Sequence, residues 1–402
     1  MRTQQTRTQP TMTVPTTMPT RVPIPMLRGC GILPPYLLQR LAQNDDPRIA
    51  AAAAASLRVD TDLRGTRDVR AARADRPGGP VTQGGLIPPH LQARTQPVPP
   101  TATAPRAAAG RAKAQRSVYD AAGGTSLPGT LKRKEGGRKV TDVSINEAYT
   151  GLGDTWSLYY RCFGRDSLDG HGLPLVASVH YGQRYDNAFW DGAQMVFGDG
   201  DGVIFNRFTA SVDVIGHELS HGFTQYTAGL IYLAQSGALN ESISDVFGSL
   251  VKQRTLKQTA DEADWLIGEG LFTAKVEGVA LRSMKAPGTA YDDDQLGKDP
   301  QPADMDHYDD LPHDADHDNG GVHINSGIPN RAFYLAATGI GGNAWEKPGQ
   351  IWYDTVTEGS LPKDCDFATF ATATVAAAEK RYGSGAESEA VQQAWTTVKV
   401  LG

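Results

Sequence analysis

The stretch VIGHELSHG, Val214–Gly222, contains two histidines four positions apart and a glutamate directly after the first. On a helix, residues four apart lie on one face, one turn above each other, so His217 and His221 can both reach one metal ion. Glu218 lies on the flank of that face, where its carboxylate can hold a metal-bound water without becoming a ligand. The stretch therefore predicts a helix that carries a metal site.

A second helix is expected to supply the third ligand. Glu241 follows His221 at a distance that allows the first helix to end and a second helix to pack beside it. Three protein ligands leave the fourth zinc position open, as a catalytic zinc site requires. Asp245, four residues after Glu241 on the same helical face, is suited to accept the free ring N–H of a ligand histidine. Two imidazoles favour zinc over calcium or magnesium.

Charge divides the 402-residue chain into two unlike parts. Residues 1–116 contain 17 Lys and Arg against 6 Asp and Glu, whereas residues 117–402 contain 22 against 39. The net charges are therefore +11 and -17. The arginines of the basic part are spaced singly among Ala, Pro and acids, which favours a solvated linker over a nucleic-acid-binding arm. The chain has no run of 18 or more apolar residues, so no membrane-spanning helix is predicted. The three cysteines are widely scattered, which favours free thiols over disulfides.

Aromatic content and periodicity set the expected domain boundaries. Residues 1–115 hold one aromatic residue and should be mostly disordered, apart from a short helix through RIAAAAAASLRV. Alternating runs such as LPLVASVHY predict a β-rich lobe over 116–225 that ends in the metal-binding helix. Helical periodicity predicts an α-helical lobe over 226–402. The expected fold class is therefore α+β with two lobes.

Four motifs in this order resemble the thermolysin-like family of zinc endopeptidases. They are VIGHELSHG, SGALNESISDVFG, NAFWDGAQMVFGDGDG and DNGGVHINSG, and the resemblance runs from about residue 116 to 402. It implies a two-lobed metallopeptidase with the active-site cleft between the lobes. It also implies that His217, His221 and Glu241 bind one zinc ion, with Glu218 as the general base and Asp245 beside a ligand histidine.

The same resemblance implies further roles in catalysis and substrate binding. Tyr232 matches the family's hydroxyl donor and His323 its imidazole donor, with Asp318 orienting that ring. Both donors would stabilise the oxyanion that forms when Glu218 activates a zinc-bound water. The expected substrate-binding residues comprise three that contact the substrate backbone and four that line an apolar pocket: Asn187, Ala188 and Arg282, and Phe205, Val214, Ile267 and Leu281. The apolar pocket predicts cleavage on the amino side of Leu, Phe, Ile or Val.

Calcium binding is expected to be weak or absent. Asp213, Asp264 and Glu269 remain at the positions where many family members hold two calcium ions. Lys252 and Leu266 stand where the family often has glutamates, so a two-ion site is not expected. This pattern is compatible with one bound calcium ion at most, and it is equally compatible with no bound calcium.

An apolar island, GCGILPPYLLQRLA, interrupts the basic arm at 29–42. It resembles the short Pro-Pro-Tyr prosegment motif of the protealysin-like subgroup, which implies an inactive precursor whose prosegment docks on the catalytic domain. Pro34 and Pro35 would pre-set an extended chain, and Tyr36 would be the anchor. The alternative is a chance apolar patch in a linker. A weaker copy at 84–94 is either a decayed duplicate or a second contact.

Two details of this arm stay open. Cys30 is expected to be a small hydrophobe at the docking edge, with a thiolate ligand for zinc as the alternative. Removal of the arm is expected by cleavage between residues 95 and 116.

Three functions compete for this sequence. The first is a zinc endopeptidase that acts on peptides and proteins, works as a monomer and is inhibited by its own prosegment. The second is an inactive relative that binds peptides, and the third is a nucleic-acid or anionic-surface binder that acts through the basic arm. No motif residue is missing, which favours the first. Residues 1–25 lack the apolar centre of a secretory signal peptide, so a cytoplasmic precursor or export by another route is expected.

Overall fold

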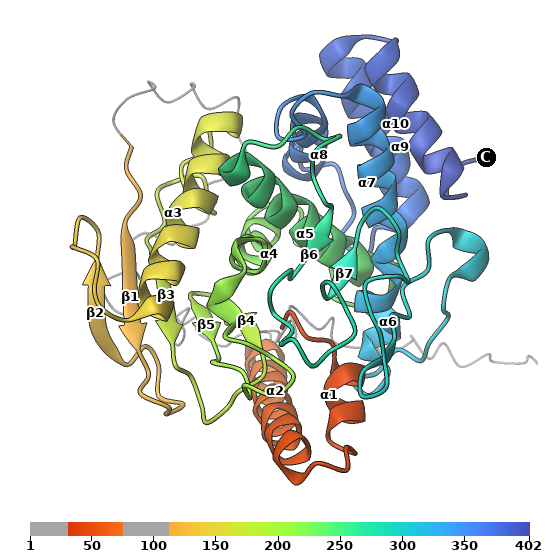
Figure 1. Ribbon diagram of the computed structural model, residues 1–402. Helices are drawn as coiled ribbons and strands as arrows, with labels where there is room; N and C mark the ends of the chain where they lie inside the picture. Colours follow the sequence, from red (N-terminus) through yellow and green to blue (C-terminus); the bar gives the residue numbers. More distant parts are fainter. Residues whose placement is uncertain (1–30, 75–111) are drawn as a thin grey trace, which may run out of the picture.

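The computed structural model describes residues 31–74 and 112–402 (Figure 1). The first lobe is built on a five-stranded mixed sheet in the order β2-β1-β3-β5-β4. Its strands are β1 Arg116–Asp120, β2 Thr130–Lys134, β3 Leu175–Val179, β4 Ala188–Trp190 and β5 Met195–Phe197. β4 is the last strand of this sheet, pairs antiparallel with β5, and has its other edge towards the N-terminal segment.

The β-rich lobe also contains a long helix, α3, Val143–Phe163. It begins where Asp142 accepts a 3.0 Å hydrogen bond from the Ile145 amide, and it ends at Gly164, whose φ of 68° is the left-handed conformation that glycine adopts freely. α3 packs on β1, on β3 and on the helix that carries His217 and His221, so it joins the sheet to that helix.

Two closely packed helices, α4 Val212–Gln225 and α5 Ala234–Leu256, form the centre of the molecule. Glycines make the close approach possible. A Cβ atom added to Gly248 would lie 2.5 Å from the Asp213 carbonyl oxygen, and one on Gly216 would lie 3.0 Å from the Gly248 Cα. A larger residue at either position would separate the helices and therefore the side chains between them.

The second lobe is helical, with two short antiparallel pairs of strands. Its helices are α6 Asp318–Asn325, α7 Gly327–Ile340, α8 Lys347–Thr357, α9 Phe367–Tyr382 and α10 Ala386–Thr397. The strand pairs are β6 Leu266–Ile267 with β7 Arg282–Ser283, and β8 Asp292–Asp293 with β9 Gly297–Lys298. Two short 3₁₀ helices, η2 Phe208–Ala210 and η3 Met305–His307, lie in the connections. Trp352, Trp395 and Phe333 are fully buried and fix the packing of the helices.

The N-terminal segment is more ordered than the sequence predicted. It forms α1, Pro35–Leu41, and α2, Pro47–Ala74, which is 28 residues long where only a short helix was expected. Figure 1 shows both helices on one side of the molecule, with α2 beneath β4 and β5. The expectation of disorder fails for residues 31–60 because many of their apolar side chains are buried in the hydrophobic core of the two lobes. The deeply buried ones are Ile32, Leu33, Leu37, Leu38, Leu41 and Ile49.

Three expectations about the arm lie outside the described residues. They concern Cys30, the second Pro-Pro copy at 84–94, and most of the expected cleavage region at 95–116. Within the described ranges, Cys162 and Cys365 are free thiols. No helix of those ranges is long and apolar enough to cross a membrane.

Candidate active site

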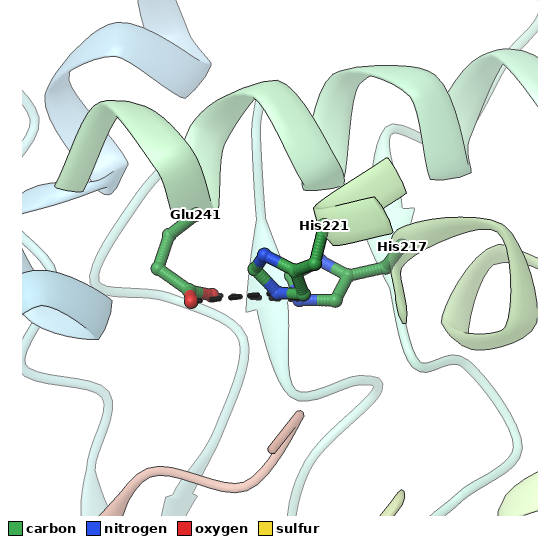
Figure 2. A group of neighbouring side chains, drawn as sticks. All are labelled: His217, His221 and Glu241. Carbon is green, nitrogen blue, oxygen red and sulfur yellow. Dashed lines mark hydrogen bonds and ion pairs between the residues drawn. The ribbon is translucent and has the colours of Figure 1, made fainter. Parts of the chain in front are cut away.

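Three possible metal ligands converge between α4 and α5 (Figure 2). His217 and His221 project from one face of α4, with their Nε2 atoms 3.0 Å apart. Glu241 reaches them from α5, with carboxylate oxygens 3.4 Å from His217 Nε2 and 3.6 Å from His221 Nε2. All three side chains are buried, so water cannot disperse their charge.

The hydrogen bonds on the far sides of the rings show that this site suits a cation. His217 Nδ1 lies 2.7 Å from Asp245 Oδ1, and His221 Nδ1 lies 2.8 Å from Asn240 Oδ1. Each Nδ1 therefore carries its proton towards an oxygen, which leaves the Nε2 lone pairs facing each other and the Glu241 carboxylate. Three acceptor groups that converge on one point are the arrangement that a metal ion satisfies.

The electrostatics agree with this geometry. Burial alone would lower the pKa of His217, but the carboxylates of Asp245 and Glu241 raise it to about 9. Burial, together with the neighbouring His217, lowers the pKa of His221 to about 4. The protein thus favours one positive charge between the rings, and a bound cation supplies it.

Asp245 lies where the sequence analysis expected it, but it has more partners than expected. Its carboxylate accepts hydrogen bonds from His217, from Arg282 and from Asn330, whose Nδ2 is 2.8 Å from Asp245 Oδ2. Asn330 and the His221 partner Asn240 were missed. Asn240 directly precedes Glu241, and Asn330 is 85 residues from Asp245, so neither had a motif that could reveal it.

Glu218 lies on α4 against the edge of the sheet. Its Oε2 accepts a 3.0 Å hydrogen bond from the Trp190 amide of β4, while Oε1 has no hydrogen-bond partner in the described part of the chain. Burial and the nearby Glu241 raise the pKa of Glu218 to about 8, against the lowering effect of His217. This carboxylate can therefore hold and release a proton near neutral pH.

Tyr232 and His323 stand together on the other side of the three ligands. The Tyr232 hydroxyl donates to Glu241 and lies 3.3 Å from His323 Nε2. His323 Nδ1 is 2.7 Å from Asp318 Oδ1, and the His323 amide donates to Asp318 Oδ2 at 2.8 Å. Asp318 and the next three residues all have positive φ, a left-handed turn for which the sequence DNGG is suited. This turn points the imidazole at the site.

Residues 31–33 of the N-terminal segment lie along β4 as an added antiparallel strand. Gly31 pairs with Phe189, and the Ile32 amide donates to the Ala188 carbonyl at 3.1 Å. The Asn187 side chain bonds both backbone groups of Leu33, accepting from its amide at 3.0 Å and donating to its carbonyl at 3.4 Å. Asn187 and Ala188, expected to bind a substrate backbone, here bind the chain's own segment.

Two side chains on the opposite wall hold the carbonyls of the same segment. His323 Nε2 lies 3.1 Å from the Gly31 carbonyl oxygen, and Arg282 donates to the Ile32 carbonyl oxygen at 3.2 Å. Residues 31 and 32 are therefore held on both sides.

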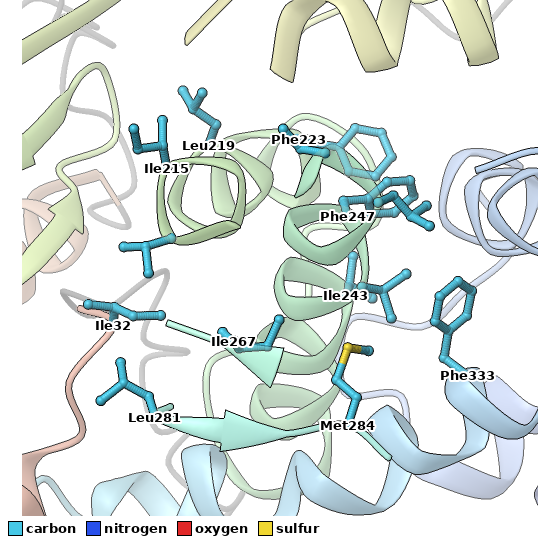
Figure 3. Packing of buried hydrophobic residues seen from close by; sticks show 14 of the residues in the cluster. Ile32, Ile215, Leu219, Phe223, Ile243, Phe247, Ile267, Leu281, Met284 and Phe333 are labelled. Carbon is cyan, nitrogen blue, oxygen red and sulfur yellow. The ribbon is translucent and has the colours of Figure 1, made fainter. Parts of the chain in front are cut away.

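The Ile32 side chain is fully buried in the hydrophobic core that also contains the residues expected to line the apolar pocket. Figure 3 shows it beside Ile267 and Leu281. Phe205 and Val214 are fully buried members of the same hydrophobic core. Tyr36, the expected anchor, is mostly buried and packs against the same core, and Ile32 is completely enclosed.

The two prolines shape the chain after this strand. Pro34 is extended, with φ of -69° and ψ of 150°, and Pro35 is the first residue of α1. This arrangement uses the fixed φ of proline twice, first to end the strand and then to begin a helix. Both prolines are buried.

The residual calcium-site carboxylates surround a lysine. Lys252 Nζ lies 2.9 Å from carboxylate oxygens of both Asp264 and Glu269, and 3.6 Å from Asp213 Oδ2. The Leu266 carbonyl oxygen is 3.4 Å from the same nitrogen. The ammonium group therefore neutralises the oxygens that a calcium ion would otherwise bind.

Family comparisons match most of the catalytic region. Residues 111–225 match the thermolysin metallopeptidase catalytic domain, and residues 228–400 match the thermolysin metallopeptidase alpha-helical domain. The chain is 56% identical over 288 residues to an extracellular metalloprotease of Pectobacterium carotovorum subsp. carotovorum, covering 72% of this chain and 82% of that protein. It is 39% identical over 293 residues to a thermolysin of Alicyclobacillus acidocaldarius, covering 70% and 50% respectively.

A solved structure extends the similarity to the N-terminal segment. The precursor of protealysin, a metalloproteinase from Serratia proteamaculans, superposes with a TM-score of 0.77 at 50% sequence identity. The superposition covers 92% of this chain and all of that one.

Proposed function

Because the chain belongs to the thermolysin family of metallopeptidases, and is thus a zinc-dependent endopeptidase with a propeptide, we propose that His217, His221 and Glu241 hold its zinc ion. One observation carries this proposal. Their three acceptor atoms converge in a buried site while both Nδ1 protons are committed elsewhere.

Zinc, when bound, supplies Lewis acidity that lowers the pKa of water and polarises the scissile carbonyl. Glu218 is the general base. It accepts a proton from the attacking water and later delivers it to the leaving amine, a role supported by its raised pKa and its unpaired Oε1.

His323 and Tyr232 donate to the oxyanion that develops on the substrate carbonyl. Asp318 holds His323 in position with both carboxylate oxygens, Oδ1 at the ring Nδ1 and Oδ2 at the backbone amide. Burial alone would lower the pKa of His323, but Asp318 and Glu241 raise it, which favours the protonated ring that can donate.

The substrate binds as an extra strand on β4, held by Asn187, Ala188 and Arg282. Phe205, Val214, Ile267 and Leu281 form the apolar wall that receives the side chain after the scissile bond. Hydrolysis therefore occurs on the amino side of Leu, Ile, Val or Phe, and the placement of Ile32 in the cleft supports this preference.

The N-terminal segment is an intramolecular inhibitor. Residues 31–33 occupy the substrate-binding edge, so peptides cannot enter until the segment is removed by cleavage between residues 95 and 116. We propose that the enzyme acts as a monomer. Lys252 takes the place of calcium, so zinc is the only metal that we propose.

Casein hydrolysis tests the proposal. The activated, zinc-loaded protein should cleave casein before hydrophobic residues, lose activity with a zinc chelator and recover it with added zinc. Glu218→Gln should lower the rate by about 10³-fold or more at unchanged zinc content, whereas the exposed control Glu277→Gln should not. A zinc-loaded, segment-free protein that leaves casein intact would support a peptide-binding function instead.

A further inference from the structure

We propose that the enzyme hydrolyses its own Gly31–Ile32 peptide bond while the N-terminal segment is docked, and that the new Ile32 N-terminus stays in the cleft as a bound product. The proposal rests on the peptidase function above. It assigns a self-cleavage site that lies well before the linker cut that activates the enzyme.

The backbone register places this bond at the position of a substrate's scissile bond. The Ile32 amide bonds the Ala188 carbonyl, and the Leu33 amide bonds Asn187 Oδ1. These are the two residues proposed to hold the backbone of a peptide substrate. The segment therefore runs in the direction of a substrate, with Ile32 as the first residue after the cut.

The side chains on the opposite wall identify the same bond. His323, which is proposed to stabilise the oxyanion, lies 3.1 Å from the Gly31 carbonyl oxygen. Arg282 binds the next carbonyl, that of Ile32, and the Ile32 side chain fills the apolar pocket (Figure 3). The carbonyl that faces the oxyanion donor therefore belongs to the residue before the pocket-filling residue, as hydrolysis requires.

The general base, Glu218 on α4, is hydrogen-bonded to the same strand. Gly31 pairs with Phe189, and the following β4 residue, Trp190, donates its amide to Glu218. Gly31 itself fits closely, because a Cβ atom at this position would lie 2.6 Å from Asn187 Nδ2. Asn187 is held by Leu33 and Asp60, so it cannot move aside without losing hydrogen bonds.

The chemistry is amide hydrolysis and needs only water. Water adds to the Gly31 carbonyl carbon, and the C–N bond to Ile32 breaks. Glu218 carries a proton from the water to the Ile32 nitrogen. The products are a carboxyl group on Gly31 and an amine on Ile32, whose N–H already points at the Ala188 carbonyl.

Most of the contacts described for the segment lie after the cut. Leu37, Leu38 and Leu41 are buried, and Arg40 donates to the carbonyls of Asp294 and Gln295. Farther along, Asp60 accepts from the Tyr185 hydroxyl at 2.5 Å and from Asn187 at 3.0 Å. Cleavage at Gly31–Ile32 leaves all of these contacts intact, so the cleft stays blocked.

N-terminal sequencing and intact mass of the zinc-loaded full chain test this proposal. We expect a species beginning ILPPYLL whose casein activity remains low until the linker is cut. Glu218→Gln should keep the bond intact. When activated wild-type enzyme is added to the Glu218→Gln variant, it should first cut the linker of the variant. The Gly31–Ile32 bond of the variant should stay intact at this stage, because the docked bond is buried against β4.

Gly31→Ala provides the positional test, with Gly385→Ala as the control at a glycine whose added Cβ would meet nothing within 4 Å. Gly31→Ala should slow the cut roughly 10-fold or more because the carbonyl is displaced from His323. Three results would each overturn the inference. Gly31→Ala could cut its Gly31–Ile32 bond at the wild-type rate, added enzyme could cut this bond early in Glu218→Gln, or casein hydrolysis could occur without any chain that begins at Ile32. Absence of casein hydrolysis under all conditions would instead show that the peptidase assignment is wrong.

Discussion

Arg282 and Asp245 form a buried, two-pronged ion pair, with Nε and Nη2 each 2.8 Å from a different carboxylate oxygen. Asp245 also accepts a hydrogen bond from His217 Nδ1, and Arg282 also donates one to the Ile32 carbonyl oxygen. Although burial alone would raise the pKa of Asp245, Arg282 and His217 hold it below its usual value. The residues proposed to bind substrate and metal therefore share one carboxylate.

Arg282→Lys should affect both functions. A lysine has one nitrogen and cannot bond Asp245 twice while also holding a substrate carbonyl. We expect kcat/KM to fall about 10²-fold and zinc affinity to fall about 10-fold, measured by peptide kinetics and by competition with a zinc chelator. Arg331→Lys, at an arginine that bonds only the Ala303 carbonyl among the contacts described, is the control and should change neither. Unchanged zinc affinity in Arg282→Lys would contradict the shared role of Asp245.

Asp60→Ala should loosen the inhibitory segment. The substitution removes the acceptor for Tyr185 and Asn187 at the far end of the docked region. Loss of these buried charge-assisted hydrogen bonds should weaken docking of the segment by about 1–3 kcal/mol. Activation, measured as the onset of casein hydrolysis, should therefore be at least about 5-fold faster. The exposed Asp45→Ala is the matched control. Equal activation rates for the two variants would show that α2 does not restrain the segment.

Lys252→Glu should make stability depend on calcium. The variant places a fourth carboxylate beside Asp213, Asp264 and Glu269 without a counter-charge. We expect a loss of about 3–5 kcal/mol in unfolding free energy without calcium, with part of it recovered when calcium is added. Wild type and the exposed control Lys285→Glu should show no calcium effect in thermal denaturation. A calcium-dependent melting temperature in the wild type would contradict the role of Lys252.

His180 should stabilise the fold in a pH-dependent way. Its ring lies 2.8 Å from both Asp199 and Asp142, and these carboxylates raise its pKa to about 9 against the effect of burial. The stabilisation is full below the unfolded value near 6.5 and is lost as the pH rises through about 9.

Urea unfolding of His180→Gln in a Glu218→Gln background, which prevents autolysis, measures this contribution. After allowance for solvent screening of these partly exposed charges, we expect a deficit of roughly 1 kcal/mol at pH 6.5 that shrinks by pH 9.5. A deficit that is equal at both pH values would mean that the charge of His180 is not what stabilises the fold.

The zinc site was predictable because its residues lie at helical spacings. His217, His221 and Asp245 depend only on the periodicity of two helices and on their packing. Asn240 and Asn330 were not predictable, because their roles follow from how three helices approach one another. The same holds for Asp60, whose partners lie more than 120 residues away.

The N-terminal segment shows the opposite limit. Its composition offers no core of its own, which led to the prediction of disorder. The core is supplied by the catalytic lobes, and residues such as Ile32 and Leu38 are completely buried there. Tyr36 was predictable as a contact because aromatic residues often dominate interfaces, whereas the complete burial of Ile32 follows only from the docking of the segment on the lobes.

The central claim is that residues 31–33 occupy the cleft as a substrate does. Competition between a fluorogenic peptide substrate and a synthetic peptide of residues 31–60, measured on the activated enzyme, tests it most directly. We predict competitive inhibition, with raised KM and unchanged kcat, that weakens at least about 10-fold when Ile32 is replaced by Asp. Inhibition that lowers kcat at constant KM, or that is indifferent to residue 32, would contradict the account.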